Sequence, residues 1–263
     1  MKTPAATILI VEDHRDLAAN VGDYLEAGGC HLAYRHRTGR GPTLVFLPGY
    51  MSDMEGGKAS ALDAWAADQG RGFLRFDYAG CGISSGAFEE QPLARWRDDV
   101  LAMLDSVVEG PAVLVGSSMG GWLMLLAALA RPAQVKALVG IAAAPDFTAW
   151  GFSEEQKLTI LSEGRLVEDS PYGDTPYVTS RAFWESGESL RLMHAPIAID
   201  CPVRLLHGQK DEDVPWTWSI EIARQLRSAD VQTLLVKDGD HRLSREFDLD
   251  LLTGTVAALM ERL

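Results

Sequence analysis

A five-residue segment near the middle of the chain has the pattern of a nucleophile elbow. Gly116-Ser117-Ser118-Met119-Gly120 reads G-x-S-x-G; it follows an apolar run at 112–115 and opens a helical pattern that begins near Met119. A sharp turn between a strand and a helix holds a serine oxygen clear of the sheet, and only very small residues fit two positions before and after it. The positive end of the following helix then faces this oxygen. The spacing predicts Ser118 as a nucleophile, with the neighbouring Ser117 as a structural residue.

A serine nucleophile needs a base and a group that orients the base. In folds built around this elbow, an acid and then a histidine follow the serine along the chain. Asp211 lies in the loop after the apolar run 203–206, and His241 lies in the loop after the run 231–236. We therefore predict Ser118, Asp211 and His241 as a catalytic triad.

Other acids and histidines fit these roles less well. Glu212 and Asp213 compete with Asp211 and are interpreted as solvated loop charges, whereas His207 ends a strand and is expected to brace the loop that carries Asp211. The triad histidine follows the serine along the chain, whereas His14, His31 and His36 precede it. His194 belongs to an inserted region.

The oxyanion of an acyl-transfer reaction needs two backbone N–H donors. One is predicted to be the N–H of Met119, directly after the nucleophile, and the other comes from the loop after the apolar run 43–47. In that loop Gly49 permits a sharp turn, so the N–H of Tyr50 is the second expected donor.

Short apolar runs alternate with helix-length segments from residue 44 onward. This alternation is typical of a parallel sheet that is covered by helices on both faces. We expect an α/β fold of the α/β-hydrolase type, with a mostly parallel central sheet. The expected strands are 43–47, 72–76, 112–115, 135–141, 203–206 and 231–236, and the expected helices are 59–69, 93–108, 119–130, 216–226 and 249–263.

The segment 146–200 interrupts this alternation because it has no buried-strand pattern and is rich in aromatic residues and proline. Long excursions in compact domains are usually functional, so we expect a helical or irregular lid over the sheet. The alternative is an ordinary surface excursion that its aromatic residues anchor to the body. Trp150, Phe152 and Trp184 are the residues of this segment that we expect to bind substrate.

Composition limits the partners and the setting. The net charge of −13 disfavours nucleic acid and anionic membranes, because such a surface cannot neutralise phosphates. No apolar stretch reaches the length of a membrane span, so stable membrane insertion is not expected, and no secretory signal is recognised at the start. Three widely separated cysteines predict neither a disulfide framework nor a zinc site and suit the cytoplasm.

Two residues after the expected strand 72–76 are expected to be non-catalytic. Asp77 is interpreted as a structural brace rather than a catalyst, and Cys81 as an inert thiol because no basic neighbour is visible to activate it.

Several motif blocks together resemble one branch of the α/β-hydrolase superfamily, that of mitochondrial acyl-glucuronide esterases and palmitoyl-protein thioesterases. The blocks are LPGYMSDM, FDYAGCGISSG, GSSMGGWLML, CPVRLLHGQKDEDVPW and DGDHRLS, and the resemblance runs from about Leu32 to the C-terminus. It implies hydrolysis of acyl esters, acyl glucuronides and long-chain thioesters, with Ser118, Asp211 and His241 in the triad.

The first thirty residues depart from that pattern. The segment 7–29 resembles the opening of a response-regulator receiver domain, in which an acidic pair holds Mg²⁺ near a phospho-accepting aspartate. The acceptor position would be Pro48, which cannot be phosphorylated. We therefore divide the chain into an atypical N-terminal segment, 1–30, and an α/β-hydrolase domain, 31–263, with a lid insertion at about 146–200.

These observations predict a serine hydrolase that cleaves small-molecule acyl esters or thioesters through an acyl-enzyme intermediate. The reaction needs no cofactor and no metal. One alternative is a carboxylesterase or lipase for small or lipid esters. A more remote alternative, based only on the receiver-like start, is a non-catalytic binding or signalling module. Acyl chain length, leaving group and oligomeric state stay open at this point.

Overall fold

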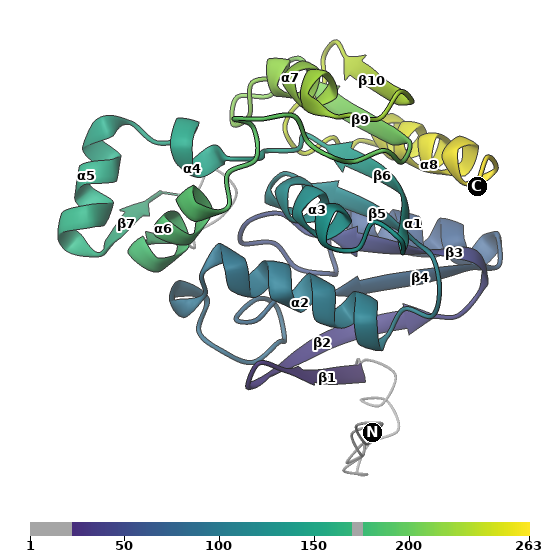
Figure 1. The fold of residues 1–263 in the computed structure, drawn as a ribbon, viewed down its shortest axis with the longest axis horizontal. Helices are drawn as coiled ribbons and strands as arrows, with labels where there is room; N and C mark the ends of the chain where they lie inside the picture. The colour runs from purple at the N-terminus through teal and green to yellow at the C-terminus, as the bar shows by residue number, and fades with distance from the viewer. Residues whose placement is uncertain (1–22, 170–175) are drawn as a thin grey trace.

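The computed structural model describes residues 23–169 and 176–263 (Figure 1). The larger part of the receiver-like segment, together with His14, lies outside the described residues.

An eight-stranded sheet forms the centre of the protein, in the order β1-β2-β4-β3-β5-β6-β9-β10. The pairs from β4 to β10 are parallel, whereas β1 with β2 and β2 with β4 are antiparallel. The expectation of a mostly parallel sheet is therefore confirmed. The strands are β1 (Asp23–Ala27), β2 (Cys30–Arg37), β3 (Arg40–Leu47), β4 (Arg71–Phe76), β5 (Ala112–Ser117), β6 (Val135–Ile141), β9 (Val203–Gly208) and β10 (Val231–Val236).

The β1–β2 hairpin was not expected from the sequence. Its register pairs Asp23 with Tyr34 and Ala27 with Cys30, and the turn between the strands uses Gly28 and Gly29 at positive φ. The boundary that we expected at residue 30 therefore falls inside a continuous hairpin of the sheet, because β1 (residues 23–27) pairs with β2, which begins at Cys30.

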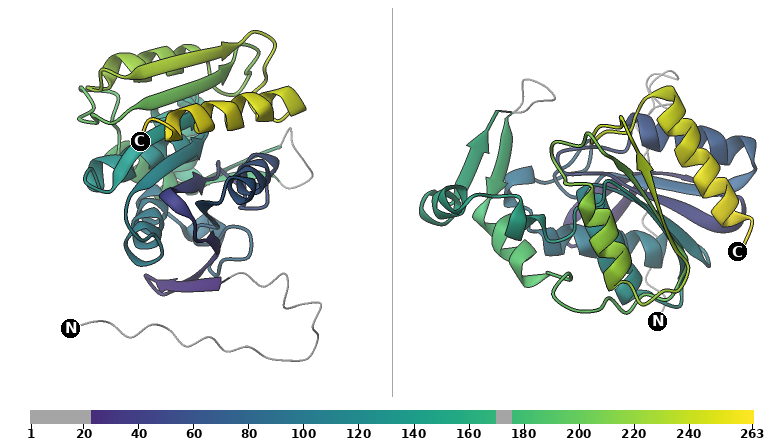
Figure 2. Two further views of the ribbon diagram at one scale, coloured as in Figure 1. Left: turned by 90° about the vertical axis from the view of Figure 1, so that its right-hand side faces the viewer. Right: turned by 90° about the horizontal axis from the view of Figure 1, so that it is seen from above.

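Helices cover both faces of the sheet (Figures 1 and 2). One apolar core contains residues of α2 (Leu93–Ser106), α3 (Met119–Ala130) and α7 (Thr217–Gln225), with Trp96 and Trp122 fully buried. The core on the other face contains residues of α1 (Gly57–Asp68) and α8 (Glu246–Met260). The expected strands β3, β4, β5, β6 and β9 are largely buried between these two cores, whereas β10, at the edge of the sheet, is only partly buried.

Between β6 and β9 the chain leaves the sheet and builds a separate projection, at the left of Figure 1. Asp146 closes its base, because its carboxylate accepts hydrogen bonds from the N–H groups of Leu192 and Met193, each at 2.8 Å for the nearer oxygen. The projection contains α4 (Phe147–Trp150), α5 (Glu154–Glu163), β7 (Arg165–Glu168), β8 (Tyr177–Ser180) and α6 (Arg181–Ser189). The antiparallel pair β7–β8 was not expected.

This arrangement positions the predicted site. Parallel strands end at the same edge of a sheet, so the loops after β3, β5, β9 and β10 meet there, beside the projection that leaves after β6. Within the part of the chain that the structure describes, no helix is both long and apolar enough to cross a bilayer.

Candidate active site

Ser118 occupies the strained turn that the sequence predicts between β5 and α3. Its backbone has φ 53° and ψ −118°, a conformation that residues other than glycine rarely adopt. A Cβ atom at Gly116 would lie 2.3 Å from the carbonyl oxygen of Gly120, and one at Gly120 would lie 2.1 Å from the carbonyl oxygen of Leu47. Glycine is therefore required on both sides of the serine, which explains the spacing of the motif.

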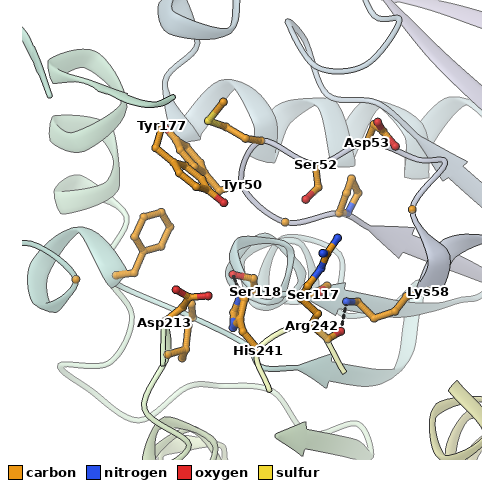
Figure 3. Close-up of a pocket in the computed structure, with 18 of the residues that line it drawn as sticks. Tyr50, Ser52, Asp53, Lys58, Ser117, Ser118, Tyr177, Asp213, His241 and Arg242 are labelled. Atoms are coloured by element: carbon orange, nitrogen blue, oxygen red, sulfur yellow. Dashed lines mark hydrogen bonds between the residues drawn. The ribbon is translucent and has the colours of Figure 1, made fainter. Parts of the chain in front are cut away.

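The three residues predicted as a triad come together at this turn. His241 Nε2 lies 3.2 Å from Ser118 Oγ, and His241 Nδ1 lies 2.8 Å from Asp211 Oδ2. Figure 3 shows His241 beside Ser118. The residues come from three different loops, after β5, β9 and β10. With its Nδ1–H donated to the carboxylate, His241 presents Nε2 as an acceptor to the serine hydroxyl, as a general base requires.

The side chain of Asp211 has no exposed surface and is held by several donors. Its Oδ1 accepts the backbone N–H groups of Asp213 at 2.9 Å and Val214 at 2.8 Å. Its Oδ2 accepts a hydrogen bond from His207 Nε2 at 3.0 Å as well as the one from His241. Burial raises the pKa of this carboxyl, but the hydrogen bonds from the two histidines outweigh burial and hold the pKa well below its usual range. Asp211 therefore stays charged beside His241, and the predicted bracing role of His207 is confirmed.

The loop after β3 lies directly against the nucleophile. A Cβ atom at Gly49 would lie 3.3 Å from Ser118 Cβ, so a larger residue would press on the serine. Within the described residues, the N–H groups of Tyr50 and Met119 donate to no acceptor in the protein. They are the two donors that the sequence predicts for the oxyanion: Tyr50 lies in the loop after β3, and Met119 is the first residue of α3.

A pocket of about 700 Å³ opens at Ser118 and His241. One side of it is aromatic: Tyr50 and Tyr177 stack with their ring planes 11° apart, and both line the pocket (Figure 3). The predicted Trp150 and Phe152 also line it, and Trp150 stacks on Trp218 at 4.9 Å. An apolar group that is attached to Ser118 and extends toward the projection would lie among these rings.

Trp184, unlike Trp150 and Phe152, does not line the pocket, so its position does not support the predicted contact with substrate. Its indole N–H donates to the carbonyl oxygen of Thr148 at 3.0 Å and thereby joins α6 to α4. The same helix buries Phe183 instead, which packs against Tyr50 at 4.9 Å. The aromatic residue of α6 that supports the site is thus the neighbour of the predicted one.

The opposite side of the pocket carries two basic residues as well as Asp53 (Figure 3), and the basic pair was not expected from the sequence. Lys58 of α1 and Arg242 line the pocket, and Lys58 Nζ donates to the backbone carbonyl of Arg242 (Figure 3). Burial lowers the pKa of Lys58 to about 8, and the nearby charge of Arg242 adds to this effect. Only the position of Arg242 next to His241 could have indicated this feature, because α1 carries no pattern that points to a site.

Asp77 and Cys81, in the loop after β4, have the structural roles expected of them. Asp77 accepts the N–H groups of Met54 at 2.7 Å and Ile83 at 3.0 Å and so braces two loops. Burial raises the pKa of the Cys81 thiol to about 12, so little thiolate forms near neutral pH.

Three ligand-type atoms, from Asp211, Asp213 and His241, lie within 4.8 Å of one another, as a cation site would require. Asp211 Oδ2 and His241 Nδ1 are already hydrogen-bonded to each other, so this cluster is accounted for by the triad geometry.

Comparison with known proteins agrees with this geometry. A family model described as alpha/beta hydrolase family matches residues 44–252. The mouse mitochondrial palmitoyl-protein thioesterase ABHD10 is 44% identical over 237 residues, which cover 89% of this chain and 80% of the mouse protein.

Two solved structures are similar over nearly their whole length. The structure of mouse alpha/beta hydrolase domain-containing protein 10 has a TM-score of 0.85 and 42% identity, covering 91% of this chain and 98% of its own. A crystal structure of a protein from Agrobacterium vitis S4 has a TM-score of 0.85 and 37% identity, covering 90% of this chain and 97% of its own. The chain belongs to the alpha/beta hydrolase family.

Proposed function

We propose that this hydrolase is a serine thioesterase and esterase that releases long acyl groups through an acyl-enzyme intermediate. The observation that carries the proposal is the continuous hydrogen-bonded chain from Ser118 Oγ through His241 to the buried carboxylate of Asp211. A serine beside a base that is oriented by a charged acid is the arrangement that activates a hydroxyl for attack on a carbonyl carbon.

The first half of the reaction forms the acyl-enzyme. Ser118 Oγ attacks the carbonyl carbon of the substrate, and His241 Nε2 takes the hydroxyl proton. The negative charge that develops on the carbonyl oxygen faces the N–H groups of Tyr50 and Met119. The bond from carbon to the leaving oxygen or sulfur then breaks, and His241 gives its proton to the leaving group.

The second half releases the acid. Water takes the place of the leaving group, His241 removes one of its protons, and the resulting hydroxide equivalent attacks the acyl carbon. The ester bond to Ser118 breaks, and His241 returns the proton to Oγ. Every proton is carried by His241, so the route uses only water and side chains of this chain.

The pocket supports a long acyl group. Its aromatic side, with Trp150, Phe152 and Tyr177, lies on the projection and offers apolar surface beside Ser118. A relative 44% identical to this chain is named a palmitoyl-protein thioesterase, and palmitoyl is a long acyl group. The leaving group would then lie on the side of Lys58 and Arg242, where a polar or negatively charged group finds basic partners.

Labelling with a fluorophosphonate probe tests the nucleophile. We expect the probe to label Ser118 in the full chain, and Ser118→Ala to lose labelling and at least about 10⁴-fold of turnover. Ser117→Ala is the matched control, because it removes the adjacent hydroxyl of the same elbow, and it should keep both labelling and most of the activity. Labelling that persists in Ser118→Ala contradicts the assignment.

The acyl preference is tested separately with p-nitrophenyl esters and the matched acyl thioesters, from acetyl to palmitoyl. We expect kcat/KM to rise with chain length and thioesters to be cleaved at least as well as the esters. An enzyme that prefers acetyl or butyryl esters and spares thioesters is a carboxylesterase for small esters, and our substrate assignment is then wrong.

A further inference from the structure

A fully buried histidine lies behind the triad acid, on the side away from Ser118. His207 and Asp211 both have side chains without exposed surface, and His207 Nε2 lies 3.0 Å from Asp211 Oδ2. This is the same oxygen that accepts the hydrogen bond from His241 at 2.8 Å. One carboxylate oxygen thus serves two imidazoles, of which only His241 reaches the serine.

The surroundings of His207 determine which of its ring nitrogens carries a proton. Nε2 faces the carboxylate of Asp211 and, at 3.0 Å, the carbonyl oxygen of Val214. Both groups only accept hydrogen bonds, so Nε2 must be the donor. Nδ1 lies 2.7 Å from the hydroxyl of Ser219, which has 1% exposure on α7. The serine hydroxyl can donate to Nδ1 and thereby hold the ring in the Nε2–H tautomer.

We propose that His207 is a positioning residue that sets the basicity of His241 by sharing the carboxylate oxygen of Asp211. A hydrogen bond from His207 withdraws negative charge from Oδ2, so the carboxylate attracts a protonated His241 less strongly. The inference rests on the proposed function, in which His241 is the base.

Several charged groups act on His241 besides Asp211, and none of them changes in the variants below. They are Asp213 in the loop after β9, Asp240 and Arg242 beside His241, Asp53 in the loop between β3 and α1, Lys58 of α1, and Glu168 and Asp169 of the projection. A shift that follows substitution of His207 therefore reports the hydrogen bond to Asp211.

The test is the pH dependence of kcat/KM for p-nitrophenyl acetate, measured with the full chain. In His207→Leu we expect the acidic limb to move to higher pH by about 0.5–1 pH unit, because Asp211 then holds the proton of His241 more tightly. His207→Gln is the matched variant, since its side-chain amide can donate from nearly the place of Nε2, and it should bring the limb back toward that of the wild type.

Ser219→Ala keeps the buried His207 ring and removes only the hydroxyl beside its Nδ1. It therefore tests the same hydrogen bond if His207→Leu does not fold. A weaker donor at Nε2 follows from the loss of this bond, and we expect a smaller shift of the acidic limb in the same direction. A purely structural role would lower kcat in these variants and leave the limb where it is.

The ¹⁵N chemical shifts of the His207 ring provide a readout on the unmodified chain. We expect protonated Nε2 and unprotonated Nδ1; the opposite tautomer overturns the inference, as does an unmoved acidic limb in every folded variant. Fluorophosphonate labelling of the same wild-type preparation distinguishes a failure of the proposed function from a failure of the role proposed for His207. An unlabelled Ser118 means that the proposed function fails, whereas labelling with an unmoved limb means that only the role of His207 fails.

Discussion

The side-chain hydroxyl of Tyr50 donates a hydrogen bond of 2.6 Å to the backbone carbonyl of Val178. Tyr50 belongs to the loop after β3, whose backbone lies against Ser118, and Val178 belongs to β8 of the projection. Burial raises the pKa of Tyr50 above its ordinary value, so the hydroxyl keeps its proton and remains a donor. The same residue therefore offers its N–H to the proposed oxyanion and its hydroxyl to the projection that lines the acyl side of the pocket.

Tyr50→Phe should weaken the attachment of the β7–β8 hairpin while keeping an aromatic ring at position 50. The carbonyl of Val178 loses its donor, so we expect a loss of about 1 kcal/mol in the free energy of unfolding. We also expect KM for palmitoyl substrates to rise by about fivefold, with little change for acetyl substrates, because the hairpin lines the pocket beyond the serine. Denaturant unfolding and kinetics over the acyl series measure both effects.

The control for that variant is Tyr24→Phe, which removes an exposed hydroxyl from β1 at the far edge of the sheet. If Tyr50→Phe behaves like Tyr24→Phe in both measurements, the projection is not held through this hydroxyl.

The lowered pKa of Asp211 predicts how stability depends on pH. A carboxyl whose pKa is lower in the folded than in the unfolded chain stabilises the fold above its unfolded pKa, about 3.9. That contribution is lost as pH falls below this value toward the folded pKa. We expect Asp211→Asn to be less stable than the wild type at neutral pH, and the difference to shrink as pH falls below about 4. Thermal unfolding from pH 3 to pH 7 measures this difference.

Asp250→Asn is the control, because it neutralises an exposed carboxylate at the surface of α8. A stability difference for Asp211→Asn that stays constant across the acidic range would mean that the carboxylate is not held in its charged form. Turnover of Asp211→Asn should also fall by about 10⁴-fold, since His241 loses the charge that orients it.

Local rules were sufficient to predict the centre of the site. The elbow around Ser118 is specified by two glycines that no other residue can replace, and Asp211 and His241 follow strands that end at one edge of the sheet. Parallel strands bring such loops together whatever their distance in sequence, which is why an acid and a base far along the chain from the serine could be predicted. The central sheet followed from its continuous apolar runs for the same reason.

The features that the sequence did not reveal depend on tertiary contacts. The strands β7 and β8 are four residues long, and neither is buried along its length, so they carry no buried-strand pattern. The sequence could not separate Trp184 from Phe183, because a helix of nine residues does not show which of its faces will pack against Tyr50. Ser219 and Lys58 reach the site from α7 and α1, whose sequences describe ordinary amphipathic or buried helices.

Lys58 should make the enzyme sensitive to the charge of the leaving group in a pH-dependent way. Its pKa of about 8 means that the ammonium is present below that pH and lost as pH rises through it. We expect kcat/KM for an ester with a carboxylate on its leaving group, divided by that for a neutral ester, to fall about 3- to 10-fold between pH 7 and pH 9. Taking the ratio removes the ionisation of His241, which both substrates share.

Lys58→Met should remove this pH dependence, and Lys58→Arg should keep the ratio high at pH 9 because guanidinium remains charged. Lys136→Met is the control, since Lys136 is exposed and away from Ser118. A ratio that does not change with pH in the wild type contradicts placement of the leaving group beside Lys58.

Two glycines in helices should respond in opposite ways to the same substitution. In Gly120→Ala the new Cβ would lie 2.1 Å from the carbonyl oxygen of Leu47, a backbone atom that cannot move without displacing β3. We expect a loss of several kcal/mol, at least about 3, and a loss of fluorophosphonate labelling because Ser118 moves with the turn. Gly254 lies inside α8, where a Cβ atom would have nothing within 4 Å, so Gly254→Ala should stabilise the protein by about 0.5–1 kcal/mol. Thermal unfolding of the two variants gives the comparison, and equal effects at both sites would show that the close packing of the elbow is not what requires glycine at position 120.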